Sequence, residues 1–290
     1  EYTERTKLYT FEMTSKMMQG YINYLAGKGK KPSTIVNRVT IIRRLFNKVK
    51  DVHNDYDLGI LNVKNYPFRR LKYPDVVSQA GNKSLSLKDL LKVINTTIPE
   101  GKGYRAYELE YGRDYFMLSF YLIGINPADM WDLKKDQLKD GWITYSRRKT
   151  QRRKGGAEIC VPVSSYAQRL IDAHKGRGEY LLDMRDNYAS LESFVLQINR
   201  KLHKMHPILK VDIGEDNFTW YSARHTWASI AANECSFSDA EVARALNHQS
   251  EHKVTRGYIR PDWSLLDRMN EAVLAVVFEK KAEEDESAPA

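Results

Sequence analysis

Apolar residues recur at helical spacing through most of this chain, and only one short stretch departs from that pattern. Such spacing is typical of α-helices that pack one face on a core, and it is found in residues 11–26, 33–50, 84–98, 113–123 and 262–281. The exception is GWITYSRRKT followed by AEICVPV, two β-prone segments separated by QRRKGG, which predict a hairpin with a basic tip. We therefore predict a mainly α-helical fold with one small antiparallel β-sheet.

The 290 residues allow one large or two modest domains, and a run of turn formers, Gly81-Asn82-Lys83, places a boundary near residue 80. We predict a helical domain over 1–80, a second domain over 81–261, and a C-terminal helix with an acidic tail over 262–290. Thr14 and Ser33 are the candidate N-caps of the first two helices. The predicted core stripe of the second helix is Ile35, Val39, Ile42, Leu45, Phe46 and Val49. Because the chain begins with Glu1 rather than Met, we expect an upstream segment to be missing.

The chain has 46 Lys and Arg residues against 37 Asp and Glu residues, a net charge of +9. This charge favours a polyanionic partner, above all double-stranded DNA. The candidate DNA contacts are Lys28, Lys30, Lys31, Arg38, Arg43, Arg44 and Lys48 in the first domain and Arg147, Arg148, Arg152 and Arg153 in the hairpin. No segment is apolar over the length of a membrane span, and the first residues lack the apolar centre of a signal peptide. The two cysteines, Cys160 and Cys235, exclude a disulfide framework and a Cys-rich zinc site. We expect a cytoplasmic, nucleoid-associated protein without cofactor or metal.

The most specific pattern lies in residues 219–260. It consists of Arg224-His225-Thr226, then Leu246-Asn247-His248, then Tyr258 ten residues later. This order and spacing resembles the signature of the tyrosine recombinase (phage integrase) family, and Lys149 in the hairpin lies where that family has its catalytic lysine. Tyr-x-x-Arg-His-Thr and Gly-x-Asn-x-x-Asp at 124–129 are most similar to integrases of Bacteroides-type mobile elements.

The resemblance covers roughly residues 10–280 and implies a two-domain architecture, a helical (SAM-like) core-binding domain followed by an α/β catalytic domain. It also implies site-specific DNA recombination for a mobile genetic element, by integration or transposition. The expected assembly is a homotetramer on double-stranded DNA with exchange of the C-terminal helix, assisted by host or element-encoded DNA-bending proteins. The apolar face of the C-terminal helix that would pack on the neighbouring protomer consists of Leu265, Leu266, Met269, Val273, Val276 and Val277. The alternative is that this face packs on its own domain.

The chemistry follows from the residue types. Rejoining DNA strands without an external energy source requires a covalent intermediate, which the Tyr258 phenolate would form as a 3′-phosphotyrosyl bond. The planar Arg224 guanidinium can donate two hydrogen bonds to the nonbridging phosphate oxygens. His248 would add a donor or take part in proton transfer, and Lys149 would protonate the departing 5′-hydroxyl. No metal is required.

Two positions depart from the family pattern. Asn126 stands where the family has its first arginine, so either activity is reduced or another base, with Arg113 as a candidate, supplies the charge. Tyr221 replaces a histidine and would either bind a phosphate oxygen or pack. His225 and Asp129 are expected to support the reacting groups from behind. A DNA strand-transfer enzyme and a catalytically impaired DNA-binding protein of the same fold therefore both remain open.

Overall fold

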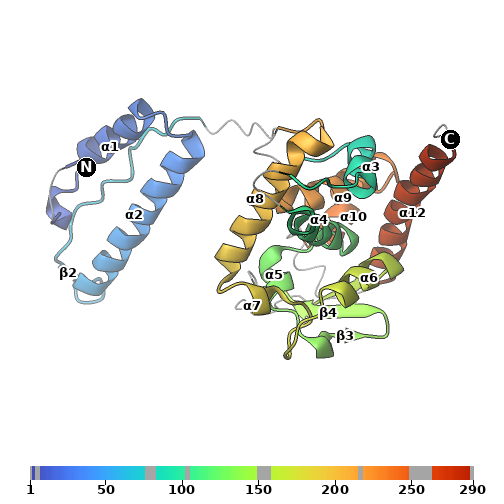
Figure 1. Ribbon diagram of the computed structural model, residues 1–290. Coiled ribbons are helices and arrows are strands. Elements are labelled where there is room, and N and C mark those ends of the chain that lie inside the picture. Colours follow the sequence, from blue (N-terminus) through green and yellow to red (C-terminus); the bar gives the residue numbers. More distant parts are fainter. Residues whose placement is uncertain are drawn as a thin grey trace. The chain divides into compact units, whose positions relative to one another are not determined.

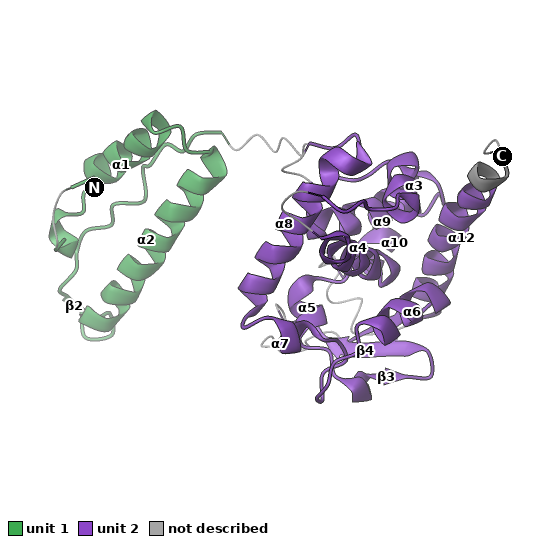
Figure 2. Ribbon diagram, in the orientation of Figure 1, with its two compact units in different colours: residues 1–80 green, residues 81–290 purple. Residues whose placement is uncertain are grey.

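The computed structural model describes residues 2–3, 7–75, 83–101, 105–148, 158–214, 218–247 and 263–287, with side chains up to residue 282. The chain forms two compact units, residues 1–80 and 81–290 (Figure 2). Each unit has its own apolar core.

The first unit is a pair of helices, α1 (Ser15–Gly27) and α2 (Pro32–His53). A short 3-10 helix, η1 (Thr10–Glu12), precedes them, and two short antiparallel strands, β1 (Asn54–Asp55) and β2 (Ile60–Leu61), follow. The Thr14 hydroxyl accepts a hydrogen bond from the Met17 N–H over 3.1 Å, which confirms the predicted cap of α1. The core between the helices contains Met18, Ile22, Leu25, Ile35, Val39 and Phe46.

Two expectations for α2 were wrong. The helix begins at Pro32 with Lys31 at the N-cap, so Ser33 is not a cap, because proline at the first helical position already has the required φ. Leu45 and Val49 are 61% and 38% exposed rather than in the core. In the described part of this unit, α2 packs against one longer helix, α1, and against the segment with Tyr66 and Phe68, and these neighbours leave the face with Leu45 and Val49 uncovered.

The second unit is built around α4 (Ala106–Tyr121), which contacts α8 (Leu191–Leu209), α9 (Trp220–Asn233) and α6 (Ser165–Ala173) (Figure 1). Every residue from Tyr115 to Tyr121 is buried, because neighbours cover α4 on several sides. The other helices in the described residues of this unit are α3 (Leu87–Asn95), α5 (Pro127–Trp131), η2 (Lys135–Gln137), α7 (Met184–Asn187), α10 (Asp239–Ala245) and α12 (Ser264–Ser287).

The sheet of the second unit has the order β3–β4–β5 and is antiparallel throughout. Strand β4 (Trp142–Ser146) pairs with β5 (Glu158–Pro162) in a register from Trp142 opposite Pro162 to Ser146 opposite Glu158. This confirms the predicted hairpin, whose tip lies outside the described residues. The two-residue strand β3 (Leu138–Lys139) was not predicted. The prediction of a mainly helical fold with a small antiparallel sheet is confirmed.

Helix α12 packs on its own unit in the single chain. Its residues Leu266, Met269, Val273 and Val277 are buried in the core. The Trp227 indole N–H donates to Asn270 Oδ1 over 2.9 Å, and Asn270 Nδ2 donates to the Tyr121 carbonyl over 3.0 Å. The arrangement thus corresponds to the alternative weighed above, and exchange with a neighbour remains a prediction that requires this stripe to leave its present position.

Candidate functional site

Helix α9 carries the Tyr-x-x-Arg-His-Thr motif, and its first turn is held by neighbouring segments. The Trp220 N–H donates to Asn199 Oδ1 on α8 over 2.9 Å, and Thr219 N–H donates to Ser222 Oγ over 3.0 Å. The fully buried Thr226 hydroxyl accepts from the Leu85 N–H over 2.8 Å. Thr226 therefore anchors the start of the second unit on α9, a role that the sequence analysis did not assign.

Arg224 is a buried cation, with only 7% of its surface exposed. Its Nη1 donates to the Gly124 carbonyl over 2.9 Å, and its Nη2 donates to the Leu246 carbonyl. Burial, and next the positive charge of Arg147, lower the pKa of Arg224, but a guanidinium keeps its proton at any pH the protein meets. Two carbonyls from distant segments thus fix the plane of this charge.

The loop between α4 and α5 approaches α9 so closely that it requires a glycine. Gly124 has a φ of +63°, and a Cβ built on it would lie 2.5 Å from Arg224 Cα. The next residue, Ile125, accepts a hydrogen bond from the Trp220 indole over 3.2 Å. The loop and the motif helix therefore form one rigid contact, in which the position of Gly124 sets the position of Arg224.

A second arginine lies beside the first. Arg147, at the end of β4, has its Nε 3.7 Å from Asp129 Oδ2, and its Nη1 donates to the Asn247 carbonyl over 3.0 Å. The Arg148 N–H donates to the other Asp129 oxygen over 2.9 Å. Burial raises the pKa of Asp129, against the opposing effect of these hydrogen bonds and charges. Arg224, Arg147 and Asp129, called here the arginine cluster, line one small hollow with Asn247.

The hydrogen bond between Arg147 and Asn247 connects two segments, and each is followed in the sequence by an expected catalytic residue. Arg147 is bonded to Asn247, the residue before His248, and it lies two residues before Lys149. His248, Lys149, Tyr258, Arg152 and Arg153 themselves lie outside the described residues. Their roles therefore remain predictions.

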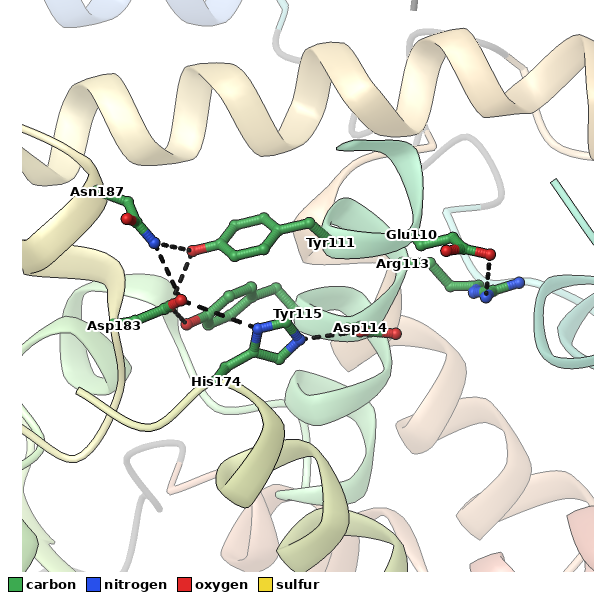
Figure 3. A network of polar contacts seen from close by, with 8 residues as sticks. All are labelled: Glu110, Tyr111, Arg113, Asp114, Tyr115, His174, Asp183 and Asn187. Atoms are coloured by element: carbon green, nitrogen blue, oxygen red, sulfur yellow. Dashed lines mark hydrogen bonds and ion pairs between the residues drawn. The ribbon is translucent and has the colours of Figure 1, made fainter. Parts of the chain in front are cut away.

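Asn126 and Arg113, the two residues considered for the first arginine, are both engaged locally. Asn126 Oδ1 accepts from the Ala128 N–H over 3.1 Å and so caps α5. Arg113 Nη1 donates to the Thr96 carbonyl over 2.8 Å, and its guanidinium pairs with Glu110 (Figure 3). The contacts of Arg113 thus lie at α3 and on α4 rather than at the arginine cluster, and a phosphate role would require it to exchange them.

Tyr221 and His225 lie on the more open side of α9. Their rings meet edge to face with centroids 5.1 Å apart, and Tyr221 is 44% exposed. Burial, and then the positive charges of Lys83 and Arg224, lower the pKa of His225. His225 is thus held neutral beside the buried cation, as a residue that supports a site would be, whereas the Tyr221 hydroxyl is placed where a ligand can approach.

In the first unit, part of the predicted basic set surrounds a hollow of about 520 Å³. Lys28, Lys30 and Arg38 line it together with the rings of Tyr21 and Tyr24. Of the other basic candidates in this unit, Lys31, Arg44 and Lys48 are exposed, and Arg43 is half-buried. Cations beside aromatic rings suit contacts with a nucleic-acid backbone.

The described residues show neither a metal site nor a membrane span. They contain no group of His, Cys, Asp or Glu side chains placed to hold a metal ion. No helix in the described ranges combines the length and the apolarity needed to cross a membrane.

Neither a family model nor a curated protein matches the sequence, but solved structures share its fold. A lambda integrase dimer bound to a COC′ core site superposes with a TM-score of 0.55 at 16% identity, covering 83% of this chain and 81% of that one. A Tn1549 transposon integrase in complex with transposon right end DNA gives 0.58 at 12% identity, with 93% and 89% covered. A lambda integrase tetramer bound to a Holliday junction gives 0.57 at 15%, with 83% and 66% covered. The chain therefore has the fold of tyrosine recombinases, while the Bacteroides-type detail remains a prediction.

Proposed function

We propose that this chain, which has the fold of tyrosine recombinases, is a site-specific DNA recombinase or integrase of a mobile genetic element. One observation carries the proposal. Arg224 lies on helix α9, which carries the first part of the family-like motif, and its buried guanidinium is fixed by the backbone carbonyls of Gly124 and Leu246. Burying a cation is costly, and a fold that retains one at a rigid position has use for it.

In the proposed reaction the Tyr258 oxygen attacks the scissile phosphorus. The phenol gives its proton to His248 or to solvent, the bond from its oxygen to phosphorus forms, and the bond from phosphorus to the 5′-oxygen breaks. Arg224 donates to the nonbridging oxygens, where negative charge grows in the transition state. Lys149 returns a proton to the departing 5′-oxygen, and His248 adds a donor or takes part in proton transfer. The phosphodiester energy stays in the 3′-phosphotyrosyl bond, and the reverse steps join a new strand.

The proposed partner is double-stranded DNA, bound by both units. Two of the similar solved structures are a lambda integrase dimer bound to a core site and a lambda integrase tetramer bound to a Holliday junction. Because recombination cuts both strands of two duplexes, four active sites are needed, which favours a homotetramer of this chain on DNA. We further propose exchange of α12 between protomers, assistance by DNA-bending proteins, and action in the cytoplasm at the nucleoid.

A catalytically impaired DNA-binding protein of the same fold is the second candidate. The observation that favours it is Asn126, which brings no charge to the position of the first arginine and whose side-chain oxygen caps α5. A scaffold that binds DNA can persist after one catalytic charge is lost.

A nicked suicide duplex separates the two candidates, because the short strand released by cleavage diffuses away and traps the protein–DNA bond. The proposal predicts a covalent adduct on denaturing gels with the parent chain and none with Tyr258→Phe, at nearly equal DNA affinity. Tyr107→Phe is the matched control, since that ring is exposed on the first turn of α4. Binding of the parent chain to cognate DNA without any adduct supports the impaired protein, and an adduct that survives Tyr258→Phe removes Tyr258 as nucleophile.

A further inference from the structure

The proposed reaction leaves one charge unaccounted for. In the transition state two nonbridging oxygens share the growing negative charge, and Arg224 is one guanidinium. Asn126 stands at the position of the family's first arginine, but its side chain is a neutral helix cap. The structure contains another guanidinium beside Arg224, that of Arg147.

Arg147 is built into the protein rather than displayed on its surface. Its side chain is 13% exposed, and its partner Asp129 is 5% exposed. Its Nη1 also donates to the carbonyl of Asn247, a residue with a left-handed φ of +49°. Its neighbour Arg148, by contrast, is 54% exposed and pairs with Asp132 at the surface. Of these two hairpin arginines, only Arg147 is directed into the hollow that Arg224 lines.

The arginine cluster brings two guanidinium groups to one hollow. Arg224 and Arg147 contribute two positive charges and Asp129 contributes one negative charge. The repulsion is visible in Arg224, whose pKa is lowered by burial and next by Arg147. Holding like charges together away from water is unfavourable unless an anion shares the site. A phosphodiester that accepts hydrogen bonds from both guanidinium groups would reduce this repulsion, because it carries a negative charge.

We propose that Arg147 takes the place of the missing arginine and donates to a nonbridging oxygen of the phosphodiester that Arg224 binds. Asp129 then acts as its positioning residue, holding the guanidinium from behind through Nε. Arg113 is not needed for this role, because its guanidinium lies at Thr96 and Glu110 and not in the hollow that Arg224 and Arg147 line. The inference rests on the proposed function and explains how cleavage can proceed with Asn126 in place.

The test compares cleavage of normal DNA with cleavage of DNA carrying a methylphosphonate at the scissile position. A methyl group there replaces one nonbridging oxygen and removes the negative charge. On the normal phosphate, Arg147→Ala should slow single-turnover adduct formation by about 10²-fold or more, as expected for loss of one charge-stabilising donor. On the methylphosphonate, the difference from the parent chain should shrink to less than about tenfold. Arg105→Ala, an exposed arginine just before α4, is the matched control and should equal the parent on both substrates.

The possible results separate the two proposals. If the parent chain forms no adduct on cognate DNA, the proposed function fails before Arg147 is tested. If the parent chain is active and Arg147→Ala is equally active, or is slowed equally on both substrates, the proposed function stands and the inference is overturned, because a purely positioning role is indifferent to phosphate charge. Should Arg147→Ala lose its folded circular dichroism spectrum, Arg147→Lys replaces it. That variant keeps the charge and stem, and it should be at least about tenfold slower on phosphate and near the parent on methylphosphonate.

Discussion

Replacing Gly124 with alanine tests whether the contact between its loop and α9 holds Arg224 in place. Two penalties apply to this substitution. An alanine at a φ of +63° costs about 1–2 kcal/mol, and a methyl group 2.5 Å from Arg224 Cα and 2.6 Å from its Cβ forces the loop and α9 apart, which adds about 1–3 kcal/mol. Gly141 is a matched control, since it has a φ of +78° with no atom within 4 Å of the added methyl. Gly141→Ala therefore carries the first penalty without the second.

The comparison is read by calorimetry and by cleavage. In a domain the size of residues 81–290, each kcal/mol moves Tm by roughly 2–4 °C, so Gly124→Ala should melt about 2–12 °C below Gly141→Ala. Gly124→Ala should also lose about 10²-fold in cleavage rate, since a displacement near 1 Å misplaces the Arg224 guanidinium. Equal melting temperatures for the two variants would refute the close contact. A lower Tm for Gly124→Ala with an unchanged cleavage rate would refute its role in placing Arg224.

Three further predictions concern other parts of the protein. Asn270→Ala removes the side chain that bridges the Trp227 indole and the Tyr121 carbonyl, and both groups lose this partner inside the core. The free energy of unfolding, measured by denaturant titration, should fall by about 2–4 kcal/mol. An unchanged midpoint would show that α12 does not depend on this bridge. The pKa of His225 is lowered in the folded protein, so the unfolded chain takes up a proton first as pH falls below about 6.5, and stability is lost on acidification. The free energy of unfolding of His225→Gln should therefore fall less than that of the parent chain between pH 7.5 and 5.5. Joint replacement of Lys28 and Arg38 by alanine should make the slope of log K for DNA binding against log salt shallower by about 1.8, two phosphate contacts at about 0.9 each, and an unchanged slope would remove the hollow of the first unit from the DNA interface.

The sequence predicted those elements whose signals are local. Thr14 caps α1 because its hydroxyl reaches an N–H three residues away, and the hairpin follows from β-prone segments on either side of a basic turn. Leu45 and Val49 were misassigned to the core because periodicity identifies a helix face but not the number of helices that cover it. Helix α4 begins at Ala106, earlier than the predicted residue 113, because Leu109 is the only large apolar side chain that its first two turns bury completely, which gives too weak a periodic signal.

The site followed from the sequence only in part. Arg224 was identified from the spacing of its motif, but the carbonyls that hold it belong to Gly124 and Leu246, far away in the chain, and no periodic signal predicts such contacts. The anchoring of Leu85 on Thr226 spans 141 positions and was missed for the same reason. The polar network of Tyr111, Tyr115 and Asp183 likewise forms only when α4 meets the segment before α7 (Figure 3).

The placement of Arg147 had a signal that the sequence analysis did not use. Side chains alternate across a strand, and in β4 the inward positions are Ile143 and Tyr145, both buried. Continuing that alternation places Arg147 inward and Arg148 outward, and the structure finds 13% and 54% of these side chains exposed. The basic residues of the hairpin therefore differ in orientation. The alternation of side chains along the strand directs Arg147 toward the buried Arg224 and leaves Arg148 at the surface. The same division explains why two adjacent arginines receive different proposed roles, one at the reacting phosphate and one along the DNA backbone.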